Sequence, residues 1–272
     1  MKEKTFEELT ITDDFIFTKV MQNQGLCKKF LEMLLSVKIL QITYLQGQKT
    51  IDIAYDSKGI RLDVYVDDEK GTIYNIEMQT TRRKNLPKRS RYYQGMIDLD
   101  LLEKGADYEE LQKSYVIFIC TFDPFGKGRH IYTFENICLE DTDIQLKDDS
   151  IKVFVNTKGT MSDISQELQD LMNYFNGMTA TKGFTKELHK EVERIKENED
   201  WRREYMTLEM RERERYREGF GDGKEQGLEQ GIINSIGVVL SLGFDEETAL
   251  TKVAVQYEMS VDKIQRIWEQ RQ

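Results

Sequence analysis

Residues 60–79 read IRLDVYVDDEKGTIYNIEMQ, and this stretch decides the fold. Apolar and polar side chains alternate through residues 60–67 and again through residues 72–79. Such alternation predicts two strands that each have one buried face. The intervening DEKG is typical of a short turn. We therefore expect a β-hairpin in this part of the chain.

The expected hairpin sets two carboxylates opposite each other. If the turn is centred on Lys70, Asp63 faces Glu77 and Arg61 faces Gln79. A slip of one residue would send one carboxylate to the other face of the sheet. Directly opposed side chains have Cβ atoms about 5 Å apart, and like charges at that separation destabilise a sheet.

A bound divalent cation would make such a pair of acids tolerable. Mg²⁺ prefers oxygen ligands and commonly takes one or two carboxylates together with water and substrate phosphate. Two other interpretations remain open. In one, Asp63 and Glu77 simply face water on an amphipathic hairpin; in the other, Arg61 neutralises Glu77 diagonally as a surface ion pair.

A dense basic run follows the hairpin. Residues 82–91, RRKNLPKRSR, carry six basic side chains and no acidic one, although the chain has 39 Lys and Arg against 49 Asp and Glu and a net charge of −10. Basic side chains beside a metal site attract and position phosphates. The candidate DNA-binding residues are Arg82, Arg83, Lys84, Lys88, Arg89 and Arg91. The alternative is a solvated loop paired with the excess carboxylates.

Periodicity in the flanking segments predicts an α/β domain over residues 8–175. The helix expected at 12–36 has Gly25 as an internal weak point and Thr12 or Asp13 as its N-cap. The other helices are expected at 88–104 and 163–176, and the strands at 49–55, 60–67, 72–79, 114–122, 130–134 and 151–155. The run 114–122 is continuously apolar, which indicates a strand buried on both faces.

The remainder of the 272-residue chain is expected to be helical. Residues 185–218 predict one long solvated helix or a weak coiled coil, and glycine then recurs every four residues from Gly219 to Gly231. Short helices are expected at 232–242 and 245–270. This gives a connector at 176–231 and a small helical module at 232–272.

These residues resemble the PD-(D/E)XK nuclease core and, more closely, its recombination-promoting nuclease and transposase (Rpn) family. The resemblance covers about residues 8–231. The stretches that carry it are TDDFIFTKVM (12–21), RLDVYV (61–66), IEMQ (76–79), RSRYYQGMID (89–98), GADYEELQKSYVIFICTFDPFG (105–126), YTFENIC (132–138), VFVNTKG (153–159) and EGFGDGKEQGLEQG (218–231).

The resemblance implies a restriction-endonuclease-like α-β-β-β-α-β core, with a mixed sheet flanked by helices and a helical C-terminal extension. It also implies an Mg²⁺- or Mn²⁺-dependent deoxyribonuclease that hydrolyses phosphodiester bonds as an endonuclease, associated with recombination or mobile elements. Asp63 and Glu77 match the metal-binding carboxylates, and the Met78 carbonyl matches a third ligand. Asp14 lies in the N-terminal helix motif, where capping or packing is the expected role.

Gln79, the third expected catalytic residue, occupies the position of the superfamily's lysine. A lysine can carry positive charge beside the attacking water or the scissile phosphate, whereas a glutamine can only form hydrogen bonds. Glutamine is typical of the closer family. The missing charge has to come from elsewhere, and Arg82, Lys84 and Arg91 are the candidates.

Composition argues against other chemistry. Cys27, Cys120 and Cys138 are isolated and lack metal-ligand spacing, and His130 and His189 are the only histidines. This weakens zinc, Ser-His and Cys-His mechanisms and suits a reducing cytoplasm. No apolar run approaches the length of a membrane span, so no membrane partner is expected.

Two alternative functions remain open. One is a catalytically silent protein that keeps the nuclease fold and assists DNA binding or transposition. The other is a DNA-binding regulator that uses a helix-turn-helix at residues 246–268. DNA is the expected partner in every case, with a homodimer through the C-terminal helices as a further prediction.

Overall fold

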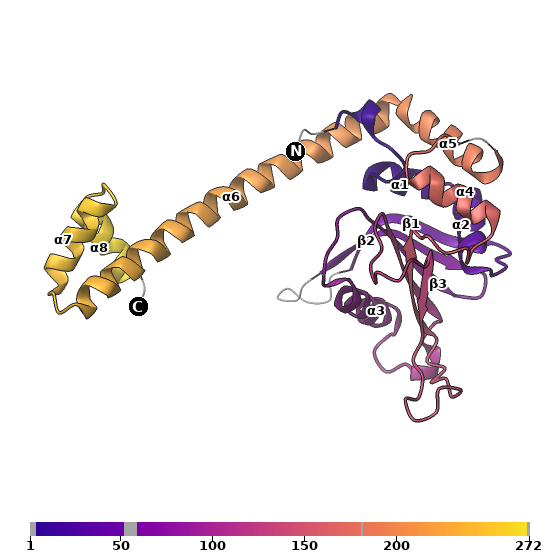
Figure 1. The fold of residues 1–272 in the computed structure, drawn as a ribbon, viewed down its shortest axis with the longest axis horizontal. Coiled ribbons are helices and arrows are strands. Elements are labelled where there is room, and N and C mark those ends of the chain that lie inside the picture. The colour runs from indigo at the N-terminus through magenta and orange to yellow at the C-terminus, as the bar shows by residue number, and fades with distance from the viewer. Residues whose placement is uncertain (1–3, 52–58, 181, 271–272) are drawn as a thin grey trace. The chain divides into compact units, whose positions relative to one another are not determined.

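The structure is a computed structural model that describes residues 4–51, 59–180 and 182–270 (Figure 1). The chain divides into two units, Met1–Arg202 and Arg203–Gln272. The first unit holds the α/β core, and the second is helical. Among the helices that the structure describes, none combines the length and apolar character needed to cross a bilayer.

A mixed six-stranded sheet with the order β1-β2-β3-β4-β6-β5 forms the centre of the first unit. The strands are β1 (Ile42–Ile51), β2 (Ile60–Asp68), β3 (Ile73–Gln79), β4 (Ser114–Cys120), β5 (Ile131–Phe134) and β6 (Ser150–Asn156). The first three strands are antiparallel neighbours, β3, β4 and β6 run parallel, and β5 is antiparallel to β6. The predicted α/β architecture, a mixed sheet flanked by helices with a helical C-terminal region, is confirmed.

Helices cover both faces of this sheet (Figure 1). Their bounds are α1 (Asp14–Met21), α2 (Gln24–Leu35), α3 (Leu86–Leu101), α4 (Gln166–Phe175) and α5 (Gly183–Lys196), with short 3-10 turns at Phe6–Glu8 and Tyr108–Glu110. Helix α3 connects the parallel strands β3 and β4 and lies on one face, whereas α1, α2, α4 and α5 lie on the other (Figure 1).

The core beneath α3 explains the apolar pattern of the strands. Its buried members from α3 and the sheet include Leu62, Tyr65, Leu86, Tyr93, Met96, Ile97, Val116, Phe118 and Phe154. Strand β4 is buried from Val116 to Cys120, on both faces, as its continuous apolar run predicts. This packing holds α3 against the ends of β3 and β4.

The hairpin of β2 and β3 has the predicted register. Val64 lies opposite Ile76, and Tyr65 lies opposite Asn75. The turn is organised by the buried Asp68, whose Oδ1 accepts hydrogen bonds from the Lys70 and Thr72 amides at 2.8 and 2.9 Å. Its Oδ2 accepts a third hydrogen bond, from a tyrosine hydroxyl of β3.

Several helix and strand predictions are wrong in their bounds. The helix expected at 12–36 is two helices, because the Asn23 side chain accepts hydrogen bonds from the Gly25 and Leu26 amides and begins a new helix there. Its N-cap is Asp13, one of the two residues expected. The strand expected at 49–55 begins earlier, at Ile42, and its residues 52–55 lie outside the described residues.

The helix expected at 185–218 is also wrong as a single element. Its first apolar residues, Leu188, Val192 and Ile195, are buried in α5, which contacts α1, α2 and α4. A new helix, α6 (Glu199–Ser241), follows Asn198, whose side chain accepts hydrogen bonds from the first amides of α6. Helix α6 continues without a break through the glycine-periodic segment at residues 219–231.

The second unit has a small core of its own. The end of α6 packs with α7 (Glu246–Gln256) and α8 (Val261–Glu269). Its buried residues are Ile232, Ile236, Ala249, Leu250, Val253, Ala254, Ile264 and Ile267. The separate helix expected at 232–242 is therefore the end of α6, and the segment expected at 245–270 forms two helices.

We predict that Asp68→Ala destabilises the first unit by about 2–4 kcal/mol, because two turn amides and a buried tyrosine hydroxyl lose a charged acceptor. Urea unfolding would measure the change. The exposed neighbour Lys70→Ala is the control and should stay within about 0.5 kcal/mol of the wild type. Equal stability of the two variants would contradict the prediction.

Candidate active site

Asp63 of β2 and Glu77 of β3 meet where the regular pairing of the two strands ends. Their ladder runs as far as Val64 and Ile76, and the next pair is joined through side chains instead. The Asp63 amide donates to Glu77 Oε1 at 3.1 Å, and the Met78 amide donates to Asp63 Oδ2, also at 3.1 Å. The structure therefore brings the two predicted acids together, with the Met78 main chain beside them.

Burial makes this acid pair electrostatically unusual. Glu77 is 1% exposed, and the loss of solvent raises its pKa, with the nearby charge of Asp63 as the second cause. Burial also raises the pKa of Asp63, and the charge of Asp14 adds to that shift. A buried and a partly buried carboxyl group that both favour protonation form a site that a cation would stabilise in its charged form.

Arg89, in the first turn of α3, reaches directly into the acid pair. Its Nη2 donates to Glu77 Oε2 at 3.0 Å, its Nη1 to Gln79 Oε1 at 2.8 Å and its Nε to the Tyr93 hydroxyl at 3.0 Å. The guanidinium lies over the rings of Tyr93 and Phe118, 5.1 Å from each centroid. These contacts orient a single positive charge toward the two carboxylates.

Both open interpretations are wrong for Glu77. Glu77 does not face water, and its arginine partner is Arg89 rather than Arg61. Arg61 is exposed, and its charge lowers the pKa of Asp63.

Gln79 fixes the arginine. Its side-chain amide donates to the Thr81 carbonyl at 2.6 Å, while its oxygen accepts from Arg89. The predicted catalytic glutamine thus lies at the acid pair and holds the group that carries positive charge there.

The basic run separates into three kinds of residue. Arg89 points inward, and Arg82 donates to the Asp123 carbonyl at 2.8 Å and lies over the Phe122 ring. Arg82 is exposed, as are Arg83, Lys84, Lys88 and Arg91. Arg82, Lys84 and Arg91 were expected to replace the missing lysine charge. The basic residue that contacts Gln79 is instead Arg89.

Arg89 was predicted only as a DNA-binding residue, yet its spacing from apolar residues in the sequence indicates its inward position. Arg89 follows Leu86 by three residues and precedes Tyr93 by four, so all three lie on one helical face. Because Leu86 and Tyr93 belong to the core beneath α3, that face points at the sheet. The neighbouring Lys88 and Arg91 fall outside it.

The described residues contain no group of three or more His, Cys, Asp or Glu side chains suited to a metal ion. The acid pair therefore offers two carboxylates, with a main-chain carbonyl as a further oxygen. This donor set fits Mg²⁺, which is commonly held by one or two carboxylates with water and substrate phosphate.

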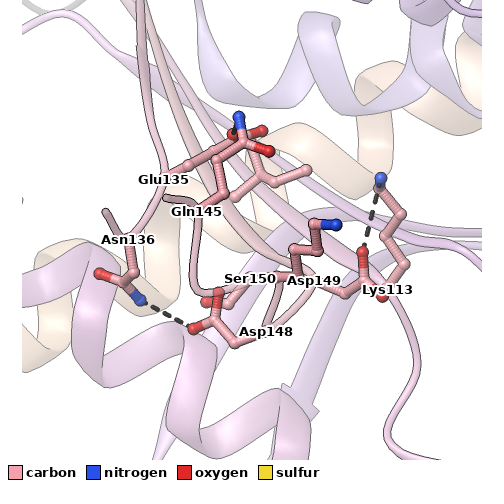
Figure 2. A pocket seen from close by; sticks show the side chains of 9 residues that line it. Lys113, Glu135, Asn136, Gln145, Asp148, Asp149 and Ser150 are labelled. Atoms are coloured by element: carbon pink, nitrogen blue, oxygen red, sulfur yellow. Dashed lines mark hydrogen bonds and ion pairs between the residues drawn. The ribbon is translucent and has the colours of Figure 1, made fainter. Parts of the chain in front are cut away.

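A separate cavity of about 310 Å³ lies at the other end of the strands (Figure 2). It is lined by residues that begin β4 and β6, whereas Glu77 and Gln79 lie beside the last residues of β4. In it, Lys113 pairs with Asp149 at 3.6 Å, and Asn136 donates to Asp148 at 2.7 Å (Figure 2). None of the predicted site residues lines this cavity.

A family model described as PD-(D/E)XK nuclease family transposase matches residues 12–220. The chain belongs to this family. The match spans α1, the acid hairpin, α3 and the first part of α6, which confirms the suspected kinship with nucleases related to mobile elements. No curated protein and no solved structure matches the chain.

The raised pKa values of the acid pair make the stability of the folded protein depend on pH. The pKa values of Asp63 and Glu77 in the folded state lie above those in the unfolded chain. At pH values between the unfolded and folded pKa values, the folded state therefore binds more protons than the unfolded state. The free energy of unfolding without metal should therefore fall as pH rises from about 4 toward the raised values. Chemical unfolding at several pH values would measure the slope.

Asp63→Asn is the matched variant for this measurement. It keeps the shape of the side chain but removes one of the two charges, so it should flatten the slope and exceed the wild type in stability at pH 8 without metal. Added Mg²⁺ should stabilise the wild type more at pH 8 than at pH 5. Parallel slopes for the two proteins would show that the pKa of Asp63 is not raised in the folded state.

Proposed function

We propose that this chain is a metal-dependent DNA endonuclease, associated with recombination or mobile elements. The observation that supports this most directly is the pair formed by the buried Glu77 and the partly buried Asp63, joined by reciprocal hydrogen bonds and faced by Arg89. A structural ion pair would need only one acid. The second acid makes the group suited to binding a cation and, through it, a phosphodiester.

Asp63 and Glu77 would hold Mg²⁺ or Mn²⁺, with the Met78 carbonyl as the third protein oxygen. When bound, such an ion supplies Lewis acidity to a phosphate oxygen and lowers the pKa of a coordinated water. The protein's own contribution is to hold both acid side chains in place. The amides of Asp63 and Met78 do this by donating to the two acids.

In this proposal Arg89 takes the place of the superfamily's lysine. A guanidinium has five N–H donors, and one bond each from Nε, Nη1 and Nη2 goes to Tyr93, Gln79 and Glu77. Two donors then remain for a phosphate, and the side chain is 27% exposed, so substrate can reach it. Gln79 would serve as the support that keeps this arginine aimed at the scissile group.

The exposed basic residues would bind the DNA backbone. Arg83, Lys84, Lys88 and Arg91 lie on the loop and helix that follow the acid pair. Contacts of this kind release counterions from DNA, so they add affinity without sequence preference and weaken as salt increases.

A silent nuclease fold is the second candidate, and one observation favours it. Arg89 already supplies positive charge to Glu77, as a cation would, and could hold the acids together without metal. The helix-turn-helix alternative has weaker support, because the second of its two helices, α8, exposes only Lys263, Gln265 and Arg266 as non-acidic polar candidates for DNA contacts.

We expect purified protein to nick plasmid DNA in Mg²⁺ or Mn²⁺ and to stop when EDTA is added. Asp63→Asn and Glu77→Gln should each lower the cleavage rate at least about a hundredfold while the circular dichroism spectrum is kept. Asp67→Asn, on the same strand, is the control and should cleave at the wild-type rate. DNA binding without nicking at every metal would favour the silent fold, and undiminished cleavage by both variants would exclude this site.

Arg89 and Arg91 should have separable effects. Arg89→Ala should lower the cleavage rate by about tenfold or more at saturating DNA, because a group aimed at the scissile phosphate is lost. Arg91→Ala should instead weaken DNA binding uniformly and reduce the salt slope of the affinity by about one. Titrations at several salt concentrations, with single-turnover rates, would distinguish them. Identical profiles would argue against an inward role for Arg89.

A further inference from the structure

Strand β2 loses its regular hydrogen bonding at Asp63 on both sides. On the β1 side, the ladder passes over Gln48, although its neighbours Gly47 and Lys49 are both paired. Gln48 has a positive φ of 56°, which is uncommon for a residue other than glycine and disfavours regular strand pairing. On the β3 side, the ladder has already ended at Val64.

The side-chain alternation of β2 also changes there. Leu62 and Tyr65 belong to the same core beneath α3, although an undisturbed strand would point them to opposite faces. Asp63 lies between them. The main chain around the candidate metal ligand is thus irregular, and support from outside the sheet would add to the side-chain hydrogen bonds that tie it to β3.

Helix α1 supplies that support through Thr18. This residue is 3% exposed, and its hydroxyl lies 3.5 Å from the Asp63 carbonyl, which is a long hydrogen bond. Its methyl group lies against Gly47 of β1. A Cβ at Gly47 would be 2.5 Å from Thr18 Cγ2 and 2.7 Å from the side-chain nitrogen of Gln22, so a larger residue there requires Thr18 to shift.

We propose that Thr18, seated on Gly47, is a positioning residue for the Asp63 carboxylate and sets the affinity of the acid pair for a divalent cation. The proposal rests on the function proposed above. Threonine is suited to this role because branching at Cβ restricts its rotamers in a helix, so it transmits the position of α1 to the strand. Mutation of a group that orients a metal ligand typically lowers metal affinity by tenfold to a hundredfold.

The test uses the full chain and a pair of compensating substitutions. Gly47→Ala should push Thr18 away and weaken the binding of Mn²⁺ alone, followed by electron paramagnetic resonance, by about tenfold or more. Adding Thr18→Ser removes the clashing methyl group and keeps the hydroxyl, so the double variant should recover to within about threefold of the wild type. The side chain of Gln22 is flexible at its end and can move aside. Gly95→Ala, which meets open space in α3, is the control.

A second readout needs no metal. The Met78 amide donates to Asp63, so its proton chemical shift in the metal-free protein reports the position of that carboxylate. Gly47→Ala should move this resonance toward the value found in Asp63→Ala, and Thr18→Ser should restore it. Should Gly47→Ala fail to fold, Thr18→Val keeps the volume but removes the hydroxyl, and it should move the resonance in the same direction.

The two readouts separate the possible failures. An unchanged Met78 resonance in Gly47→Ala, or a change that Thr18→Ser does not reverse, would overturn the positioning role even if the wild type binds Mn²⁺ and cleaves DNA. If the wild type binds no Mn²⁺, the proposed function fails, while a reversible shift of the Met78 resonance would still support the positioning of Asp63 by Thr18.

Discussion

The structure depends on the reciprocal hydrogen bonds that join Asp63 to Glu77 and Met78. They replace the main-chain ladder at the point where β2 and β3 separate, and they hold two like charges in a buried place. Bringing both charged acids together without solvent is unfavourable, which is why the pKa of each is raised. The arrangement is stable because amide donors and one guanidinium satisfy the acid oxygens. The rest of the α/β core serves to keep these groups in register.

The surroundings of that pair come from elements far apart in the sequence. Helix α3 brings Arg89 to Glu77 and Gln79, and its aromatic neighbours Tyr93 and Phe118 fix the guanidinium plane. Helix α1 approaches from another direction and supports the irregular segment of β2. The positive charge beside the acid pair thus comes from a helix, and Gln79 supports it. A planar, always charged arginine suits this location better than a second flexible amine would.

Much of this could be predicted from local pattern. Alternation in residues 60–79 gave the hairpin and its register, because a slip of one residue would expose the apolar face. The continuous apolar run of β4 and the basic segment before α3 were also recognisable. The bounds of helices were not: Asn23 and Asn198 start new helices by capping, and each competes with a periodic pattern that by itself suggests a continuous helix. The choice between Arg89 and its basic neighbours was missed because residue type, rather than helical phase, guided the assignment.

The sequence by itself determined which residues face each other across the hairpin, since strand periodicity and a short turn depend only on neighbouring residues. Only the tertiary structure decided that Glu77 is buried, that Arg89 is its partner and that Gly47 leaves room for Thr18 against Asp63. The reason is physical. Burial, ion pairing and steric fit depend on distances between segments that are remote along the chain, and those distances exist only after the helices have packed on the sheet.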